Sequence, residues 1–414
     1  MEKVFGAADI CLPKKGINME KWSVVACDQF TSEPEYWKET EEIVEDAPST
    51  LKMILPEVYL DGEDEEERLQ KIGETMKTYL EEGILEEYPN AMIYVRRTDS
   101  TGKVREGIVG CIDLEQYDYH KGSHSPVRAT EATVEERIPA RIRVRENALL
   151  ELPHIMILID DKEKNVVEPC EAVAKAGEPL YDFSLMQKGG RLQGYLLGQE
   201  EQARILSALD QLSSGEGDLV FAMGDGNHSL ASAKAFYERM KKQLPPEEYL
   251  RHPARYALAE IVNLHSPALE FEAIHRIVTE VDVQSFLEEM TKNLGLVDVG
   301  ETDRPEEQQM IMVRQGKKSR VAITRPTSKL TVGSLQNFLD EYQKDHPVKM
   351  DYIHGEETVL QLSMEENSMG FLLPQMRKEE LFPTVMADGA LPRKTFSMGH
   401  AQDKRYYTEC RKIR

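Results

Sequence analysis

An apolar stretch that runs through a short turn directly into a helix constrains the fold of this chain more than any other feature. Residues 221–229 read Phe-Ala-Met-Gly-Asp-Gly-Asn-His-Ser. A strand that opens a helix in this way presents backbone N–H groups at the helix start, where the helix dipole favours bound anions. Asp225 and His228 add a carboxylate and an imidazole, which suit phosphate and metal chemistry.

A plainer interpretation of the same residues is a capped strand–helix turn. Asp225 or Asn227 would then be the N-cap of the helix. Gly226 would supply a backbone conformation that other residues rarely adopt. The motif by itself supports the two interpretations equally.

Length and charge limit the class of protein. The 414 residues exceed one ordinary hydrophobic core, so we expect two domains or three. The net charge of -23 argues against nucleic acid or an anionic membrane as a partner, because phosphate-rich surfaces bind cationic ones. An anionic ligand must therefore be held by a local group of basic side chains.

Cysteine spacing and hydropathy indicate the cellular compartment of the protein. The five cysteines form neither a CxxC pair nor a short framework, which is typical of a reducing compartment. They are Cys11, Cys27, Cys111, Cys170 and Cys410. No export signal is recognisable, and no segment approaches 18 uncharged apolar residues. We therefore expect a cytoplasmic protein that does not enter a membrane.

Periodicity along the chain predicts an α/β (α+β) protein with mixed sheets. The predicted strands lie within 21–30 and at 91–97, 105–113, 152–159, 218–223 and 371–373, with a further hairpin across 315–318. The predicted helices lie near 35–44, from the acidic run at 61–67 through about 84, and at 200–211, 230–242, 283–293 and 335–344. The acidic run is interpreted as solvated helix surface.

The pattern of elements changes near residue 270. We expect a ligand-binding lobe over 1–270, with an inserted segment at about 50–200, and a smaller α+β lobe over 271–414. Small-ligand sites lie most often in domain clefts. The smaller lobe is therefore expected to close over the larger one through Arg393 and Lys394.

Residues 128–145 concentrate arginine in an otherwise acidic protein. The five arginines are Arg128, Arg137, Arg141, Arg143 and Arg145. Guanidinium groups match phosphate or carboxylate oxygens in pairs, so this segment is a candidate anion site. The alternative is an element edge with salt bridges to Glu131, Glu135, Glu136 and Glu146.

Other features narrow the chemistry. The sequence lacks a GxxxxGK[ST] loop, a GxGxxG after a strand, HExxH and GxSxG, which disfavours the large nucleotide-binding classes. His154, inside an apolar run, is interpreted as a satisfied core histidine. A nucleophilic Cys27 is disfavoured because the neighbouring Asp28 raises the pKa of its thiol.

Taken together, these segments resemble the domain-of-unknown-function family 1015 (DUF1015) of bacteria and archaea. The resemblance is carried by Val-Val-Ala-Cys-Asp at 24–28, Arg-Ala-Thr-Glu at 128–131, the turn at 225–228, His-Arg-Ile-Val at 275–278, Asp-Tyr-Ile-His at 351–354 and Leu-Pro-Arg-Lys-Thr-Phe at 391–396. The Asp-Gly-His-His-Arg turn typical of that family is also similar to one in free serine kinases of the ParB/sulfiredoxin-like fold. There the turn binds the phosphate donor, and a carboxylate elsewhere deprotonates the serine hydroxyl.

Carried over by position, the resemblance assigns Asp225, Gly226 and His228 to that turn. Asn227 replaces the family's first histidine and Ser229 its arginine, which removes one bidentate phosphate contact. Arg128, Arg137 or Arg141 could restore the lost charge. The further candidates for phosphate contacts are Gly226, Asn227, Ser229, Arg393 and Lys394.

The resemblance also implies the remaining roles in the site. Asp28 or Glu33, near the end of the first strand, would be the base. Magnesium would bridge the phosphates, with Asp225 as a ligand. Thr130, Glu131 and His400 are the further candidates for substrate contacts.

The implied activity is that of a phosphotransferase. It would move a phosphoryl group between pyrophosphate or a nucleotide (ADP or ATP) and a small hydroxylated metabolite, with free L-serine giving O-phospho-L-serine as the first choice. Two alternatives stay open: a non-catalytic ligand- or nucleotide-binding regulatory module, and a phosphatase acting on phosphoserine or a similar phosphomonoester. The sequence does not decide the donor, the physiological direction or the oligomeric state, for which a homodimer is one alternative.

Overall fold

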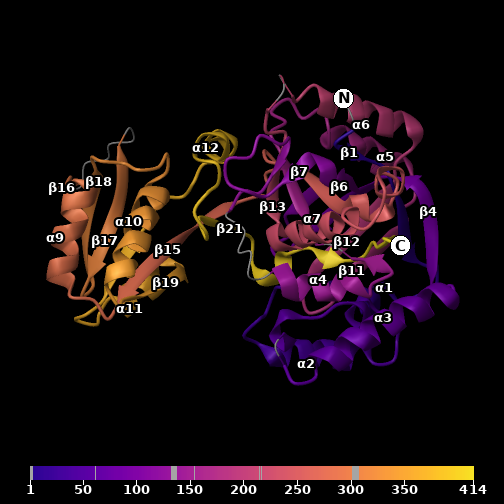
Figure 1. Cartoon of the computed structure of the whole chain (residues 1–414), viewed down its shortest axis with the longest axis horizontal. Helices are drawn as coiled ribbons and strands as arrows, with labels where there is room; N and C mark the ends of the chain where they lie inside the picture. Colours follow the sequence, from indigo (N-terminus) through magenta and orange to yellow (C-terminus); the bar gives the residue numbers. More distant parts are fainter. Residues whose placement is uncertain are drawn as a thin grey trace. The chain divides into compact units, whose positions relative to one another are not determined.

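The computed structural model describes residues 3–60, 62–131, 138–152, 154–213, 215, 217–300 and 307–414. The chain forms two compact units, which are described separately (Figure 1). The first comprises Met1–Leu269 together with His400–Arg414, and the second comprises Glu270–Gly399. The sequence had assigned all of 271–414 to the second lobe, whereas residues 400–414, hereafter the C-terminal segment, belong to the first unit.

A mixed sheet forms the centre of the first unit. Its described strands follow the order β11-β12-β5-β6-β14-β10-β13-β8-β7, and β1 pairs with β6. Their bounds are β1 Phe5–Gly6, β5 Ile93–Thr98, β6 Val104–Asp113, β7 Tyr117–Asp118, β8 Val127–Arg128, β10 Met156–Ile159, β11 Tyr181–Leu185, β12 Gly190–Leu196, β13 Phe221–Asp225 and β14 Tyr256–Asn263. Strand β10 runs parallel to β14 and antiparallel to β13, which confirms the predicted mixed α/β class.

The local sequence explains the two best-predicted parts of this sheet. Every residue of β10, Met-Ile-Leu-Ile, is buried, as expected for a central strand covered on both faces. Strands β5 and β6 form the predicted antiparallel hairpin. In its turn, Asp99 accepts hydrogen bonds from the backbone N–H groups of Thr101 at 2.8 Å and Lys103 at 2.9 Å.

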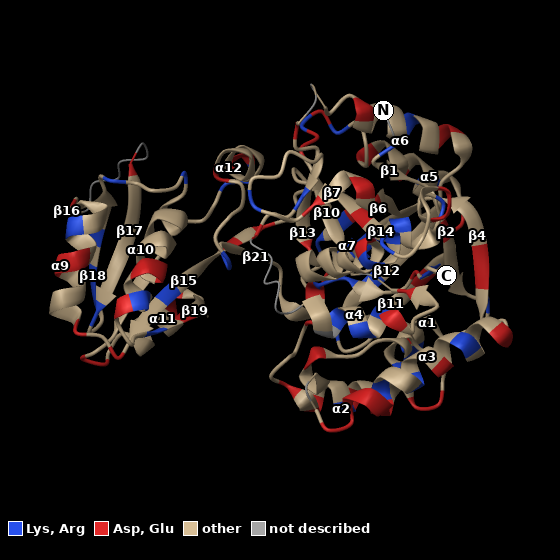
Figure 2. Ribbon diagram, in the orientation of Figure 1, with Lys and Arg blue, Asp and Glu red and all other residues tan. Residues whose placement is uncertain are grey.

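Helices and short 3₁₀ turns complete the first unit. They are α1 Met19–Trp22, α2 Pro34–Val44, η1 Thr50–Met53, η2 Glu57–Tyr59, α3 Glu65–Glu81, η3 Leu114–Gln116, α4 Ile138–Glu146, η5 Glu168–Cys170, α5 Glu171–Ala176, α6 Gln199–Asp210, α7 Asn227–Lys241, α8 Pro246–Tyr249, η6 Pro253–Arg255 and η8 Ala401–Asp403. Acidic residues are plentiful along α2 and α3 (Figure 2). On α3, Glu67 pairs with Lys71 one turn later at 2.6 Å, with both side chains exposed, as expected for solvated helix surface.

The C-terminal segment is held in the first unit by pairs of very short strands. Strand β22 (Tyr406–Tyr407) pairs with β3 (Val24–Val25), and β23 (Arg411–Lys412) pairs with β9 (Leu150–Glu151). A separate ladder joins β2 (Ala8–Pro13) to β4 (Leu85–Ala91). Two-residue strands carry no periodicity, so the sequence pattern could not predict this return of the chain.

The second unit is a smaller α+β unit around an antiparallel sheet. Its described strands follow the order β16-β18-β17-β20-β15-β19, and β21 pairs with β15. Its elements are β15 Phe271–Thr279, α9 Val283–Leu294, β16 Leu296–Asp298, β17 Gln308–Arg314, β18 Lys317–Ile323, α10 Thr331–Asp345, β19 Lys349–His354, α11 Glu356–Leu362, β20 Met369–Leu372, η7 Lys378–Glu380, α12 Leu381–Asp388 and β21 Phe396–Met398. The predicted hairpin across 315–318 is confirmed as β17–β18.

The helices of the described ranges do not meet the requirements of a membrane-spanning helix. None of the helices there combines the length and the apolar character that crossing a bilayer requires.

Candidate functional site

The strand–helix turn at residues 225–228 has an unusual cap. Strand β13 ends at Asp225, α7 begins at Asn227, and Gly226 is the N-cap with φ 79° and ψ 27°. This corrects the expectation that Asp225 or Asn227 caps the helix. A left-handed backbone favours glycine, and an added Cβ would lie 3.1 Å from the Cα of Ile155. Because no side chain caps α7, the N–H groups of its first turn can face an anion.

Asp28 lies at the centre of a partly buried polar cluster. Its Oδ2 is 3.2 Å from Nε2 of His154, and Nδ1 of the same imidazole is 2.8 Å from the hydroxyl of Tyr407. That hydroxyl also accepts a hydrogen bond of 3.1 Å from the backbone N–H of Cys27. One chain of hydrogen bonds thus joins three segments that are far apart in the sequence. The first follows β3, the second precedes β10, and the third lies within β22.

A second ion pair joins this cluster to the turn. Nζ of Lys404 lies 3.2 Å from Oδ2 of Asp225, whose Oδ1 accepts a 2.9 Å hydrogen bond from the N–H of Gly226. The charge of Asp225 acts on His154, and that of Lys404 acts on Asp28. We call Asp28, His154, Asp225, Lys404 and Tyr407 the Asp28 cluster.

Electrostatics favour the charged forms of the central pair. Burial disfavours ionisation of Asp28, but the positive charge and hydrogen bond of His154 outweigh it and hold the pKa of the carboxyl well below its usual value. Burial likewise disfavours the imidazolium of His154, but Asp28 and then Asp225 raise its pKa. Burial, followed by the charge of Asp28, raises the pKa of the Cys27 thiol to about 12. The prediction against a cysteine nucleophile is thereby supported.

A cavity of about 120 Å³ adjoins the cluster. Its wall includes His154 and Tyr407 of the cluster, Ser229 and Ser232 of α7, and Cys27, the residue before Asp28. Charged residues of the wall occur as ion pairs, Arg141 with Glu57 and Arg145 with Glu151. A cavity of this size, with imidazole, hydroxyl and guanidinium groups, suits a small polar molecule.

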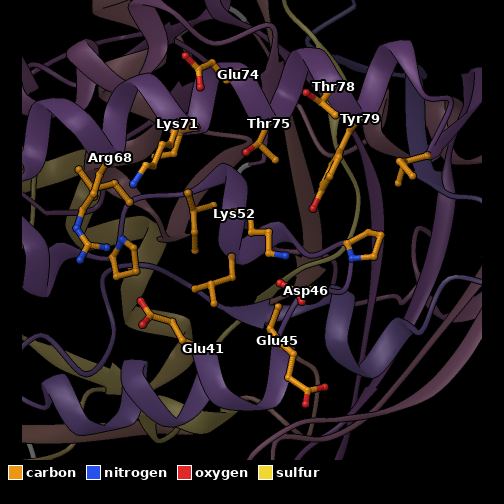
Figure 3. A pocket seen from close by; sticks show the side chains of 18 of the residues that line it. Glu41, Glu45, Asp46, Lys52, Arg68, Lys71, Glu74, Thr75, Thr78 and Tyr79 are labelled. Atoms are coloured by element: carbon orange, nitrogen blue, oxygen red, sulfur yellow. The ribbon is translucent and has the colours of Figure 1, made fainter.

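A larger cavity of about 660 Å³ lies between α2, η1 and α3. Helix α3 presents Arg68, Lys71 and Tyr79 to it, and Glu41 of α2 stands on the opposite side (Figure 3). Arg68 is already paired at 2.7 Å with Asp64 on its own helix, and Lys71 is paired with Glu67. No member of the Asp28 cluster lines this cavity, so it is the weaker candidate for chemistry.

The structure separates the arginines of residues 128–145. Arg128 is buried and donates to the backbone carbonyl oxygens of Ser125, at 2.6 Å, and Gly217. Arg141 pairs with Glu57, so its partner differs from the acids expected. Arg143 and Arg145 pair with Glu65 and Glu151 at 2.6 and 2.7 Å. Arg137, with Glu135 and Glu136, lies outside the described residues. Phosphate binding by these arginines stays a prediction.

Other predicted site residues are not gathered around Asp28. Glu33 is exposed at the start of α2, and His400 is exposed just before η8. Thr130 is buried and donates a 2.7 Å hydrogen bond to the carbonyl of Met223. Glu131 is half-buried at the end of its described range.

Two further candidates belong to the second unit. Arg393 lies 3.7 Å from Asp340 within that unit, and Lys394 is exposed. Their predicted closure over the ligand-binding lobe stays a prediction.

Sequence reasoning missed His154, Lys404 and Tyr407. His154 was expected to be buried and satisfied, which is correct, but its partner is Asp28. Its position directly before a buried strand was the available signal, because strand ends gather at a sheet edge. Lys404 and Tyr407 gave no signal, since only tertiary pairing returns the C-terminal segment to β3.

Two oxygen atoms of the turn are candidates to hold a magnesium ion that is bound together with phosphates. Asn227 Oδ1 is buried without a hydrogen-bond partner among the described residues, and the carboxylate of Asp225 stands two residues earlier. Magnesium in phosphoryl-transfer sites is commonly held by one or two protein oxygens plus phosphates and water. The described residues contain no cluster of three or more His, Cys, Asp or Glu that would hold a metal by itself.

The described residues form a mixed α/β protein with a candidate small-ligand site at a helix start. The chain belongs to the family described as "Protein of unknown function (DUF1015)", which it matches over residues 11–342. No curated protein matches it.

Solved structures with some similarity were also found. One is a free serine kinase variant in complex with AMP, at 14% identity and a TM-score of 0.43, covering 75% of this chain and 93% of that one. Another is a conserved hypothetical protein from Pyrococcus furiosus, at 12% identity and a TM-score of 0.38, covering 72% and 91%. A third is SbnI with a C-terminal truncation from Staphylococcus aureus, at 9% identity and a TM-score of 0.37, covering 70% and 82%.

The pH dependence of stability tests the Asp28–His154 pair directly. His154 has a raised pKa, so its charged form stabilises the fold fully below its usual value of 6.5, and this contribution is lost as the pH rises through the raised value. Asp28 has a lowered pKa, so its contribution is present above the usual 3.8 and is lost only at lower pH. We expect His154→Gln to cost most stability between about pH 4 and pH 6.5, and progressively less above that range.

Urea unfolding of the wild type and the variant at a series of pH values measures this difference. Fluorescence of Trp22 and Trp37, both fully buried in the first unit, reports the transition there. If the free energy of unfolding lost in His154→Gln stays constant or grows as the pH rises, Asp28 and His154 do not form a charged pair.

Proposed function

We propose that this protein is a phosphotransferase that moves a phosphoryl group between pyrophosphate, ADP or ATP and a small hydroxylated metabolite. Free L-serine, giving O-phospho-L-serine, is the first acceptor to test. The observation that carries the proposal is the coupling of the Asp28 carboxylate to the glycine-capped start of α7 through His154, Asp225 and Lys404. An acceptor for a hydroxyl proton and a binding point for phosphate thus belong to one cluster.

Each part of the cluster has a distinct role in the proposed reaction. The backbone N–H groups at the start of α7 and the ammonium of Lys404 hold the phosphoryl group. Asp28, whose side chain is 27% exposed, accepts a hydrogen bond from the acceptor hydroxyl. His154 keeps that carboxylate ionised and oriented. Such a site works through position and charge, as phosphoryl transfer requires.

The reaction is a single displacement at phosphorus. The acceptor oxygen forms a bond to the phosphorus, the bond from phosphorus to the bridging oxygen of the donor breaks, and the hydroxyl proton passes to Asp28. Magnesium, held by Asp225 and Asn227 with phosphate oxygens, would neutralise charge on the donor.

The choice of serine rests on the turn at residues 225–228, which is similar to the turn of free serine kinases. The cavity of about 120 Å³ beside Cys27 and His154 is of a size for a small amino acid, though not for a nucleotide. The donor would therefore extend from the start of α7 away from this cavity.

Phosphorus NMR of the purified protein with magnesium and L-serine tests the proposal. Pyrophosphate, ADP and ATP are supplied in separate tubes, with O-phospho-L-serine alone in a fourth. We expect a new phosphomonoester signal in at least one of the first three tubes, absent when serine is omitted. Phosphate release from phosphoserine alone would instead establish a phosphatase. Saturable binding of these ligands without turnover would establish a regulatory module, and either outcome would overturn the transferase.

A further inference from the structure

Two cysteines from opposite ends of the chain face each other in the first unit. Cys11 of β2 and Cys410 form an antiparallel bridge. The N–H of Cys11 donates to the carbonyl of Cys410 at 2.7 Å, and the N–H of Cys410 donates to the carbonyl of Cys11 at 3.0 Å. Residues that exchange both bonds have Cα atoms about 5.5 Å apart. That separation falls within the range of roughly 4.4–6.8 Å found for disulfides.

The two thiols also contact each other. They share a side-chain hydrogen bond, and Sγ of Cys410 lies 3.5 Å from the carbonyl oxygen of Cys11. This contact is the main cause that lowers the pKa of the Cys11 thiol, while it raises the pKa of Cys410. Lys412 lowers the pKa of Cys11 further. Cys11 is therefore the thiol of the pair that more readily becomes the nucleophilic thiolate.

We propose that Cys11 and Cys410 are a redox modification site, at which a peroxide converts the two thiols into a disulfide that ties the C-terminal segment to β2. The proposal does not depend on the reaction that the protein catalyses. It also revises what the sequence suggested, because cysteines separated by almost the whole chain gave no sign of pairing.

The chemistry balances with hydrogen peroxide as the oxidant. The Cys11 thiolate attacks one peroxide oxygen, the O–O bond breaks, and the departing hydroxide takes up a proton as water. The Cys410 sulfur then attacks the sulfur of the resulting sulfenic acid, the S–O bond breaks, and a second water leaves with the proton of that thiol. Two thiols lose two electrons and two protons, and the peroxide is reduced to two waters.

The proposed disulfide affects the candidate site, because Cys410 belongs to the same C-terminal segment as two residues of the Asp28 cluster. Lys404 and Tyr407 stand on the C-terminal segment shortly before Cys410, and two-residue strands pair the segment with β3 and β9. Local opening of the segment must break these strand pairs and the buried ion pairs of Arg405 and Arg411, so it is infrequent in the native protein. Cys11 and Cys410 are 1% and 0% exposed, so a peroxide reaches them during such openings. Once formed, the disulfide suppresses further opening and holds Lys404 and Tyr407 in place.

Peptide mapping after peroxide treatment of the native full-length protein tests the proposal. We expect one intramolecular linkage, between the peptides that contain Cys11 and Cys410, which a thiol reductant removes. The matched control is Cys170→Ser, which removes another fully buried cysteine and should leave the linkage intact. Cys410→Ser should abolish it. Cys11→Ser provides a second variant in case one of them does not fold.

Two physical readouts accompany the mapping. Hydrogen exchange of residues 404–413 should slow several-fold on oxidation. The melting temperature of the first unit should rise by roughly 5 °C, because closing a long loop restricts the unfolded chain. Absence of the linkage in native protein, or its appearance only after unfolding in denaturant, would overturn the proposal. A linkage that leaves exchange in residues 404–413 unchanged would overturn the effect on the C-terminal segment.

Discussion

Asp28→Asn is expected to lower the rate of phosphoryl transfer by roughly 10²–10⁴-fold, the usual range for loss of a general base. An amide cannot accept the hydroxyl proton, and it no longer balances the imidazolium of His154, 3.2 Å away. The initial rate of phosphomonoester formation, followed by phosphorus NMR with the donor that the wild type uses, measures the effect.

The matched control is Glu33→Gln, since Glu33 is the other carboxylate that the sequence offered as a base. Its side chain is exposed at the start of α2, so this change should leave the rate within about twofold. Tryptophan fluorescence of both variants checks that the first unit is folded. A rate loss in Glu33→Gln that equals or exceeds the loss in Asp28→Asn would assign the base to Glu33 and remove Asp28 from the proposed mechanism.

Arg405→Met is expected to destabilise the first unit by about 3–5 kcal/mol, as removal of one member of a buried ion network does. Nε of Arg405 lies 2.9 Å from Glu260, and its NH2 group lies 2.7 Å from Glu409. Both carboxylates are 1% exposed. Methionine has a similar length but no charge, so it leaves Glu260 with Arg105 at 3.5 Å and Glu409 without its cationic partner.

Urea unfolding followed by tryptophan fluorescence measures this change, because Trp22 and Trp37 both lie in the first unit. Arg239→Met is the matched control. Its guanidinium pairs with Glu146 at 3.0 Å, and both side chains are about half exposed, so it should cost no more than about 1 kcal/mol. If both variants lose the same free energy of unfolding, the buried network stabilises the fold no more than a surface ion pair does.

The same buried network explains why the chain returns to its first unit. Arg405, Glu409 and Arg411 carry charges that would be costly to bury alone, and their partners Glu260 and Glu151 lie in the first unit. These contacts fix β22 and thereby the hydroxyl of Tyr407 against His154. The stability of the C-terminal segment and the geometry of the candidate site are therefore coupled.

Sequence pattern predicted the elements in which buried residues are continuous or recur at a regular spacing. The apolar run that becomes β10, the hairpin β5–β6 with its Asp99 turn, and the amphipathic helices α6 and α9 all lie where periodicity indicated. Half of the site was also recognisable in the sequence, because a strand that ends at Asp225 and is followed by Gly226 and a helix is a local motif.

The other half of the site could not be predicted from pattern. Arg128 and Arg141 form a conspicuous basic segment in the sequence, yet one binds backbone carbonyls and the other pairs with Glu57. His154 looked like an ordinary core residue. Whether a charged side chain is free to bind a ligand depends on which partners the fold brings to it, and spacing along the chain does not contain that information.

Residue pattern along the chain was enough to predict the α/β class, the helix-start turn and the membership of the DUF1015 family, whose match spans residues 11–342. Local periodicity and backbone preference decide these features, and both depend on residues that are close together in the sequence. Only folding reveals that Asp28 contacts His154, that Lys404 pairs with Asp225, and that Cys11 faces Cys410. Each of these contacts joins residues far apart in the chain, so only the folded chain brings the partners together.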